Sequence, residues 1–254
     1  MCVSFINPKH YANGMFSAVT PEKGKTLDNA VEVSSYASKP YKSFSPFTYS
    51  PDFRIPVPGQ EGVYACSVES IWQGLKLIDG VADFEMFTRK PEKRNGEVQG
   101  HEFDGRVLDP VSARINIYQP AYLFYVENHV PSEAKESVLE LALKQGISFY
   151  DVESNLDIED TSAPLAHSAI LKMFFEDYLG KRKEETREKI DNAYSEQENS
   201  ETLAGPLARA LHLFSSSSEI DKKLIKLVLS QKHKGLDRFH ERYHSRLLEK
   251  IREL

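Results

Sequence analysis

The sequence predicts an α+β fold that is predominantly helical. Amphipathic helical stripes recur along the chain, whereas only short segments, such as Ile147–Tyr150, have the character of a strand. Hydrophobic residues make up 40% of the chain and charged residues 28%, as in soluble globular proteins. With 254 residues, the chain can hold one domain and an appendage. A net charge of −6 argues against a non-specific nucleic-acid coat but allows a local basic patch.

Residues 1–39 are rich in Ser, Lys, Tyr and Asn, and we expect an irregular arm with one or two strands, for example at Ala30–Tyr36. The start of the chain lacks the basic and long apolar segments of a secretory signal. No apolar run approaches the ~20 residues that span a bilayer, so we expect a cytoplasmic protein without membrane attachment. The two cysteines, Cys2 and Cys66, are too few for a disulfide framework or a cysteine metal site.

A short helix is predicted to begin after Ser67, which is a good N-cap residue. Four apolar residues then follow at the spacing of one helical stripe: Val68, Ile71, Trp72 and Leu75. The opposite face carries Glu69, Gln73 and Lys76 in one line. On composition alone, such a face is usually solvated. The alternative is that the acid and the amine line a pocket, where burial and mutual attraction tune both pKa values.

The segment Ser45–Lys76 reads S-P-F-T-Y-S-P-D-F and then, after a short insert, G-V-Y-A-C-S-V-E-S-I-W-Q-G-L-K. It resembles the signature of the NADAR (YbiA-like) N-glycosidases, which is S-P-F, then G-x-x-Y/W, then a [TS]-[VS]-E-H-x-[FY]-Q-A-x-K helix. The matching residues are Ser45, Pro46, Phe47, Gly62, Tyr64, Val68, Glu69, Trp72, Gln73 and Lys76. Ser70 stands where the family usually has His, and Gly74 where it usually has Ala. These departures indicate a divergent branch or an altered substrate, and the resemblance implies a YbiA-like core at residues 40–180.

A basic loop follows, with Lys90, Lys93 and Arg94 close to Gly96. Glycine lets backbone N–H groups approach an anion, and the cationic side chains add charge, so the loop would suit a phosphate or pyrophosphate. His101 is near enough in sequence to reach the same place. The same residues also fit a solvated surface loop. The loop is similar in outline to the P-x-x-A/K-x-x-G-R loop of the resembled family.

The next segment, Arg114–Asn128, is dense in aromatic and β-branched residues and predicts buried structure of either type. Pro120 is expected to prevent a single uninterrupted element. A helix capped by Ser132 is predicted to run to about Lys144 and to end at Gly146. A strand at Ile147–Tyr150 should follow.

Acidic and amide side chains gather directly after this strand. They are Asp151, Glu153, Asn155, Asp157 and Asp160, and they are expected to form the rim of a pocket. Val152-Glu153 with Asp157 resembles part of the l-V-E-x-[ST]-x-x-D-x-x-W-G stretch of the NADAR family, although the W-G is absent here. A calcium site is one alternative, but the order of an EF-hand is missing. The other alternative is an acidic N-cap region for the next helix.

The C-terminal part is predicted to be helical. A helix at about Leu165–Leu179 should stop at Gly180, and the charged stretch Lys181–Glu201 should contain the domain boundary. Three amphipathic helices are expected beyond it, at about Leu203–Phe214, Ser218–Gln231 and Leu236–Leu254. We interpret residues 181–254 as a helical extension used for packing, homo-oligomer contact or partner binding.

The stretch His240–His244 fits the H-E-x-x-H motif, which on a helix places two imidazoles on one face to bind zinc. The nearby arginines disfavour a dication, and little chain follows to supply a third ligand. A zinc hydrolase is therefore a lesser alternative.

The resemblance implies an N-glycosidase that cleaves a bond between a ribose C1 and a nitrogen. Such a reaction passes through an oxocarbenium-like sugar, so a carboxylate near C1 stabilises the developing charge. Glu69 is the candidate for that role or for holding ribose hydroxyls, and Lys76 is the candidate nucleophile that forms a Schiff base with the sugar aldehyde. Glu153 and Asp157 are expected to act as acid and base or to orient the sugar.

Further residues are expected to bind the substrate. Trp72 would stack on the base, and Gln73 and Asp151 would lie against the substrate. The phosphate would be held by Lys90, Lys93, Arg94 and His101. The implied substrate is an ADP-ribose-type conjugate, such as ADP-ribosylated guanine in nucleic acid, or a phosphoribosylamino heterocycle, and neither a metal nor a cofactor is expected. A non-catalytic ADP-ribose or nucleotide reader and a purely structural interaction protein are the alternatives.

Overall fold

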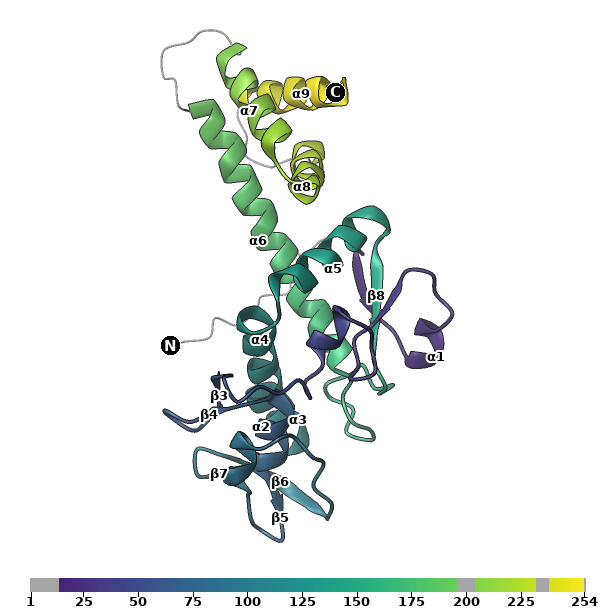
Figure 1. The fold of residues 1–254 in the computed structure, drawn as a ribbon, viewed down its shortest axis with the longest axis vertical. Helices are drawn as coiled ribbons and strands as arrows, with labels where there is room; N and C mark the ends of the chain where they lie inside the picture. The colour runs from purple at the N-terminus through teal and green to yellow at the C-terminus, as the bar shows by residue number, and fades with distance from the viewer. Residues whose placement is uncertain (1–13, 196–203, 232–237, 254) are drawn as a thin grey trace. The chain divides into compact units, whose positions relative to one another are not determined.

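The computed structural model describes residues 14–195, 204–231 and 238–253 (Figure 1). Helices account for 53% of the structure and strands for 13%, which confirms the predominantly helical α+β class. The chain divides into two compact units, Met1–Glu176 and Asp177–Leu254. In the described part of the chain, every helix is too short or too polar to cross a membrane.

A three-stranded parallel sheet forms one part of the first unit. Its middle strand is β8 (Ile147–Tyr150), flanked by β1 (Phe16–Ala18) and β2 (Ala30–Glu32), with α1 (Pro21–Gly24) between these two in sequence (Figure 1). Phe16 and Phe149 stack in parallel with ring centroids 6.2 Å apart, and both rings contact Phe175. The two strands expected at most in the predicted N-terminal arm are therefore present as β1 and β2, and they pair with β8, which lies more than 100 residues further along the chain.

The candidate helix lies among short antiparallel strands. The elements in order are η2 (Tyr41–Phe44), β3 (Ile55–Pro56), β4 (Tyr64–Ala65), α2 (Val68–Leu75), β5 (Lys76–Ile78), η3 (Phe84–Thr88), β6 (Val98–Phe103) and β7 (Arg106–Leu108). Strand β3 pairs with β4, and β6 lies between β5 and β7. Since β5 begins at the residue after α2, Lys76 has extended backbone at the end of the helix.

The aromatic segment around Pro120 forms a helical run in three parts. They are α3 (Pro110–Ala113), a π-helical turn η4 (Arg114–Tyr118) and α4 (Gln119–Asn128). Pro120 lies in the first turn of α4, where a missing N–H is tolerated, and the main-chain N–H of Gln119 bonds to the carbonyl of Arg114. The run is therefore helical but is not one uninterrupted α-helix. From it, Tyr122 and Tyr125 donate hydrogen bonds to the carbonyls of Phe44 and Ser43, which tie it to the segment before Pro46.

The helix before β8 is α5 (Ser132–Gln145). The predicted cap is displaced by one residue, because Pro131 is the N-cap and Ser132 is the first helical residue. Gly146 ends the helix with φ 68°, a left-handed conformation that favours glycine.

The long helix α6 (His167–Ser195) runs through Gly180, so the predicted stop at that residue is wrong. A glycine inside a helix costs only about 1 kcal/mol relative to alanine, and tertiary packing overrides such a propensity. Leu179, next to it, is fully buried, and Lys181 forms an ion pair with Asp177 one turn back. The boundary between the units falls within α6, after Glu176.

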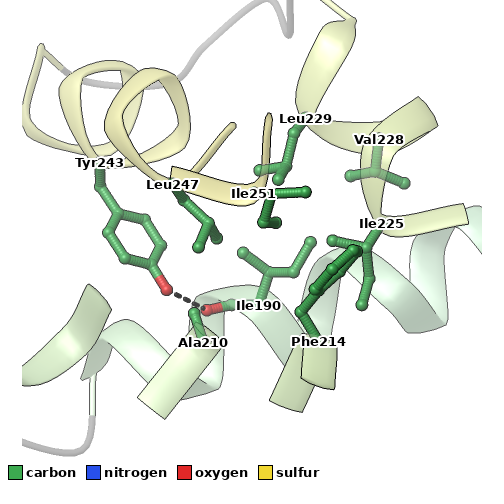
Figure 2. Packing of buried hydrophobic residues seen from close by; sticks show 9 residues of the cluster. All are labelled: Ile190, Ala210, Phe214, Ile225, Val228, Leu229, Tyr243, Leu247 and Ile251. Carbon is green, nitrogen blue, oxygen red and sulfur yellow. Dashed lines mark hydrogen bonds between the residues drawn. The ribbon is translucent and has the colours of Figure 1, made fainter. Parts of the chain in front are cut away.

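The second unit is built from the C-terminal part of α6 with α7 (Ala204–Ser216), α8 (Glu219–Ser230) and α9 (Arg238–Arg252). Its core is an apolar cluster of Ile190, Ala210, Phe214, Ile225, Val228, Leu229, Tyr243, Leu247 and Ile251 (Figure 2). The Tyr243 hydroxyl donates a hydrogen bond of 3.3 Å to the carbonyl of Ile190. The predicted helix starts at Leu203 and Leu236 lie outside the described residues.

Candidate functional site

The N-terminus of α2 is held by buried hydroxyl groups. Ser67 Oγ accepts a 3.0 Å hydrogen bond from the main-chain N–H of Ser70, as the sequence predicted for an N-cap residue. Ser70 Oγ donates to the carbonyl of Arg89 at 3.1 Å. The main-chain N–H of Glu69 donates to the carbonyl of Pro46 at 3.0 Å, which places the S-P-F segment against the first turn of the helix.

The polar line on α2 is not a solvated face. Gln73 Nε2 donates to Glu69 Oε1 at 2.6 Å, and Lys76 Nζ donates to Gln73 Oε1 at 2.9 Å. Glu69 is 6% exposed and Gln73 2%, while Lys76 is half-buried. The acid, the amide and the amine therefore form one hydrogen-bonded chain, and the interpretation of this face as surface is wrong.

Burial moves the pKa values of the acid and the amine toward each other. The pKa of Glu69 is raised, chiefly because burial penalises the carboxylate, although the hydrogen bond from Gln73 and the charge of Lys76 oppose the shift. The pKa of Lys76 is lowered, again chiefly by burial, although the charge of Glu69 opposes this. Such opposed shifts in adjacent groups are typical of sites that transfer protons or use an amine as nucleophile.

Arg94 is anchored to the end of α2. Its Nη1 donates to the carbonyls of Gln73 at 3.1 Å and Lys76 at 2.6 Å, and its Nη2 donates to the carbonyl of Val81 at 3.1 Å. Its main-chain N–H donates to Gln73 Oε1 at 3.1 Å. The guanidinium thus caps main-chain oxygens, which differs from the predicted role as a phosphate ligand.

The two lysines of this loop, Lys90 and Lys93, are exposed, and Lys93 lies close to the acidic segment and to α2. Lys93 Nζ lies 3.9 Å from Glu153 Oε1, and its charge acts on both Glu69 and Lys76. Lys90 is exposed to solvent on the same loop. We use the term Glu69 site for Glu69, Gln73, Lys76, Lys93 and Glu153.

Three aromatic rings pack together near the Glu69 site. The rings of Trp72 and His101 lie 3.9 Å apart between centroids, and Tyr118 meets Trp72 edge-on at 5.4 Å. Burial raises the pKa of the Tyr118 hydroxyl, and the charges of Glu69, Asp151 and Glu153 raise it further. The indole predicted to stack on a base is therefore already in contact with rings of the protein.

His101 is buried and carries no positive charge near neutral pH. It is 3% exposed, and burial, with a smaller contribution from Lys76, lowers its pKa to about 4. Within the described residues, neither of its ring nitrogens has a hydrogen-bond partner. The ring is neutral above that pKa, so His101 adds no positive charge to the predicted phosphate contact.

Asp151 forms a buried pair with His167. Its Oδ2 lies 2.8 Å from His167 Nδ1 and accepts the main-chain N–H of Ser168 at 3.0 Å, and its Oδ1 accepts the main-chain N–H of Glu153 at 2.7 Å. His167 Nε2 contacts the carbonyl of Val33 at 2.9 Å. Asp151 is therefore engaged within the fold, in contrast to the prediction that it contacts substrate.

The surroundings favour the charged form of both groups of this pair. Burial, the largest influence, lowers the pKa of His167, but the charge and hydrogen bond of Asp151 and the bond to Val33 outweigh it, so the net pKa is raised. For Asp151, burial raises the pKa, yet His167 and two main-chain N–H groups lower it overall. The charge of His167 also acts on Glu69. His167 and Tyr118 were not predictable as site residues from the sequence, because neither lies in a motif and each reaches the site only through the fold.

The rest of the acidic segment is built around Arg114. This buried guanidinium donates to the carbonyls of Ile158, Asp160 and Ala163 at 2.9, 2.6 and 2.7 Å. Asp157 is exposed, accepts the main-chain N–H of Glu159 at 2.9 Å, and interacts electrostatically with Arg114. Its interactions thus belong to this loop, which does not support the predicted catalytic role for Asp157.

Gly74, the second departure from the NADAR signature, has a steric reason. A Cβ atom at this position would lie 2.6 Å from Phe87 Cε1 and 3.0 Å from the carbonyl oxygen of Asp83. Alanine therefore requires Phe87 to move. The packing of η3 on α2 accounts for glycine here.

Two other features of the described structure are distinct from the Glu69 site. A shallow hollow of about 330 Å³ is lined by residues outside the Glu69 site: Val57, Gly59, Gln60, Glu61, Phe103 and Asp104. In the H-E-x-x-H stretch, His244 is 4% exposed and its Nε2 lies 3.2 Å from Asp191 Oδ1, whereas the side chain of His240 lies outside the described residues. Among the residues that the structure places, three or more His, Cys, Asp or Glu side chains nowhere gather in a manner that could hold a metal ion.

The profile of a family of unknown function, DUF6939, matches residues 21–171, which is more than half of the chain. The chain belongs to this family. The matched span contains the whole Glu69 site together with Asp151 and His167, and it ends close to the boundary between the two units. No curated protein and no solved structure matches the chain.

Proposed function

We propose that this DUF6939 protein is an N-glycosidase that hydrolyses a ribose C1–N bond, with Lys76 as nucleophile and Glu69 as acid. The observation that carries the proposal is the buried chain Glu69–Gln73–Lys76, in which burial favours a neutral acid and a neutral amine. The similarity of Ser45–Lys76 to the NADAR (YbiA-like) signature supports the reaction type. A neutral amine can attack carbon, and a neutral carboxylic acid can protonate a leaving group.

The proposed reaction has three steps. The lone pair of Lys76 Nζ forms a bond to C1 as the C1–N bond breaks, and the leaving nitrogen takes the electron pair and a proton from Glu69. The sugar ring then opens, with a proton moving from Nζ to the ring oxygen, so that Lys76 and C1 form a Schiff base. Water adds to C1 and releases the amine and the sugar aldehyde, with carboxylate Glu69 as the base for the water.

The surrounding residues supply charge and orientation in this proposal. Glu153 is 31% exposed in its side chain and is suited to orient the sugar or assist proton transfer, while Lys93, at 66%, can attract a phosphate. The proposed substrate is an ADP-ribose-type conjugate, such as ADP-ribosylated guanine, or a phosphoribosylamino heterocycle. We also propose a cytoplasmic location and leave homo-oligomer formation through the C-terminal unit to be tested by size-exclusion chromatography with light scattering.

The decisive experiment is borohydride trapping with ADP-ribosylated guanine as substrate. We expect a reduced sugar adduct on Lys76 in the mass spectrum of the digested protein, and loss of both adduct and turnover in Lys76→Arg. The matched control is Lys144→Arg, an exposed lysine at the end of α5, which should leave both unchanged. Binding of the conjugate without adduct or turnover would instead favour the non-catalytic reader, and neither binding nor turnover would contradict the proposal for this substrate.

A further inference from the structure

The orientation of the Gln73 side-chain amide is set by the main chain. Oxygen and nitrogen of an amide are nearly indistinguishable by shape, so their assignment follows from their partners. The main-chain N–H of Arg94 can only donate, and it points at one end of this amide at 3.1 Å. That end must be the oxygen, and the nitrogen must face Glu69, to which it donates at 2.6 Å.

The donor at Arg94 is itself held in place. The guanidinium of the same residue is bonded to the carbonyls of Gln73, Lys76 and Val81. The loop therefore cannot turn its N–H away without breaking contacts to the end of α2. Gln73 is also 2% exposed, so few of its atoms are open to a substrate.

We propose that Gln73 is a positioning residue for the Glu69 site, with an amide fixed by Arg94 that couples Glu69 to Lys76 without exchanging protons with either. This inference gives Gln73 a different role from the predicted substrate contact, and its catalytic meaning rests on the proposed function. Because Glu69 Oε1 accepts from Gln73, the proton of the neutral acid sits on Oε2. Because Lys76 Nζ donates to Gln73 Oε1, the lone pair of the neutral amine points away from Gln73.

Replacing the amide by a carboxylate or by an apolar chain is expected to shift the pKa of Lys76 in opposite directions. In Gln73→Glu, an anion can accept the Lys76 hydrogen bond, so protonated Lys76 is stabilised. In Gln73→Met, the acceptor is lost, so protonated Lys76 is less stable. A merely structural role for Gln73 predicts no such opposition.

The test is competitive acetylation of the folded protein with acetic anhydride over a pH series, with Lys76 quantified by peptide mass spectrometry. The midpoint is the pH at which half of the Lys76 side chains are protonated. At a pH below it, we expect labelling of Lys76 in Gln73→Glu to be about tenfold slower for each pH unit by which the midpoint rises. In Gln73→Met, we expect labelling to be faster than in the wild type. Gln145→Glu, at an exposed position ending α5, is the matched control and should leave the Lys76 midpoint unchanged.

Circular dichroism and thermal unfolding establish that each variant is folded, and if only one of them folds, the direction of its own shift is the test. The proposal is overturned if a folded Gln73 variant keeps the wild-type Lys76 midpoint or moves it in the direction opposite to the one expected. The labelling needs no substrate, so it gives its answer even where the borohydride experiment fails. Conversely, an adduct on Lys76 with an unmoved midpoint would support the proposed function and reject the role of Gln73.

Discussion

Glu69 Oε1 and Gln73 Nε2 lie 2.6 Å apart on successive turns of α2. The contact needs only the i, i+4 spacing of a helix, and the next turn extends it to Lys76. Burial of this line turns an ordinary surface pattern into an acid and an amine with opposed pKa shifts.

The negative charge of Glu69 stabilises protonated Lys76 and so partly opposes the lowering of the Lys76 pKa by burial. We expect Glu69→Gln to lower the pKa of Lys76 below its wild-type value, because the carboxylate that opposes the effect of burial is removed. Competitive acetylation should show faster labelling of Lys76 at a pH below its midpoint. Glu133→Gln, at an exposed position in the first turn of α5, serves as the control. An unchanged or raised midpoint in Glu69→Gln would contradict the coupling.

The packing of η3 against α2 predicts a steric cost at Gly74. Gly74→Ala should lower the free energy of unfolding by about 1–3 kcal/mol, because the new Cβ lies 2.6 Å from Phe87 Cε1. Urea unfolding measures the change. In a double-mutant cycle, Phe87→Leu should relieve part of the cost, so that the double variant loses less than the sum of the single ones. Additive losses would show that Phe87 is not the obstacle.

Local features of this site were predictable from the sequence, and distant ones were not. The spacing from Val68 to Leu75 and the N-cap at Ser67 predicted α2, and the prediction agrees with the structure. The partners of Arg94 and Asp151 were not predictable, since a charged loop residue does not reveal in sequence whether it faces solvent, main-chain oxygens or a buried histidine. The predicted helix end at Gly180 was wrong for a related reason, because the helix propensity of glycine, about 1 kcal/mol less favourable than that of alanine, is outweighed by tertiary packing.

The pair of Asp151 and His167 predicts a pH-dependent contribution to stability. The pKa of His167 is raised above 6.5, so its contribution is fully present below 6.5 and is lost as the pH rises through the raised pKa. The pKa of Asp151 is lowered below 3.8, so its contribution is present above 3.8 and is lost as the pH falls through the lowered pKa. We expect His167→Gln to destabilise most between these limits.

Urea unfolding of the wild type and His167→Gln, at pH values within this window and above 6.5, gives the difference in unfolding free energy. The difference should shrink as the pH rises above 6.5. A difference that is constant, or that grows with pH, would show that His167 is neutral in the folded protein. His212→Gln in α7 is a control for the intrinsic effect of losing a histidine.

His101 is expected to cost stability in its present environment. Both ring nitrogens are buried without partners in the described structure, so His101→Phe should raise the free energy of unfolding by about 1 kcal/mol while keeping a ring against Trp72. Thermal and urea unfolding measure the gain. If stability falls instead, the nitrogens contribute favourably to the native state. A gain in stability together with a loss of turnover would show that the imidazole is kept for the reaction.

The apolar cluster of the second unit predicts a ranking of two substitutions (Figure 2). Leu247→Ala should cost about 2–5 kcal/mol, because Leu247 is fully buried and its removal leaves a cavity. Tyr243→Phe should cost about 1 kcal/mol, because it removes the hydrogen bond to Ile190 but keeps the ring. Urea unfolding of the full chain checks the order, and a larger loss in Tyr243→Phe would reverse it.

The π-helical turn at Arg114–Tyr118 makes the chain there one residue longer than an α-helical path requires. Deleting the exposed Ile115 would let the turn close as regular α-helix, because a π-turn takes up one extra residue without changing the phase of the helical turns on either side of it. The helix that precedes the turn would then keep its present face relative to Tyr118. The turn is therefore a place where the chain can gain or lose one residue while the loop at Ile158–Ala163, which Arg114 holds, stays on the same side of the helix.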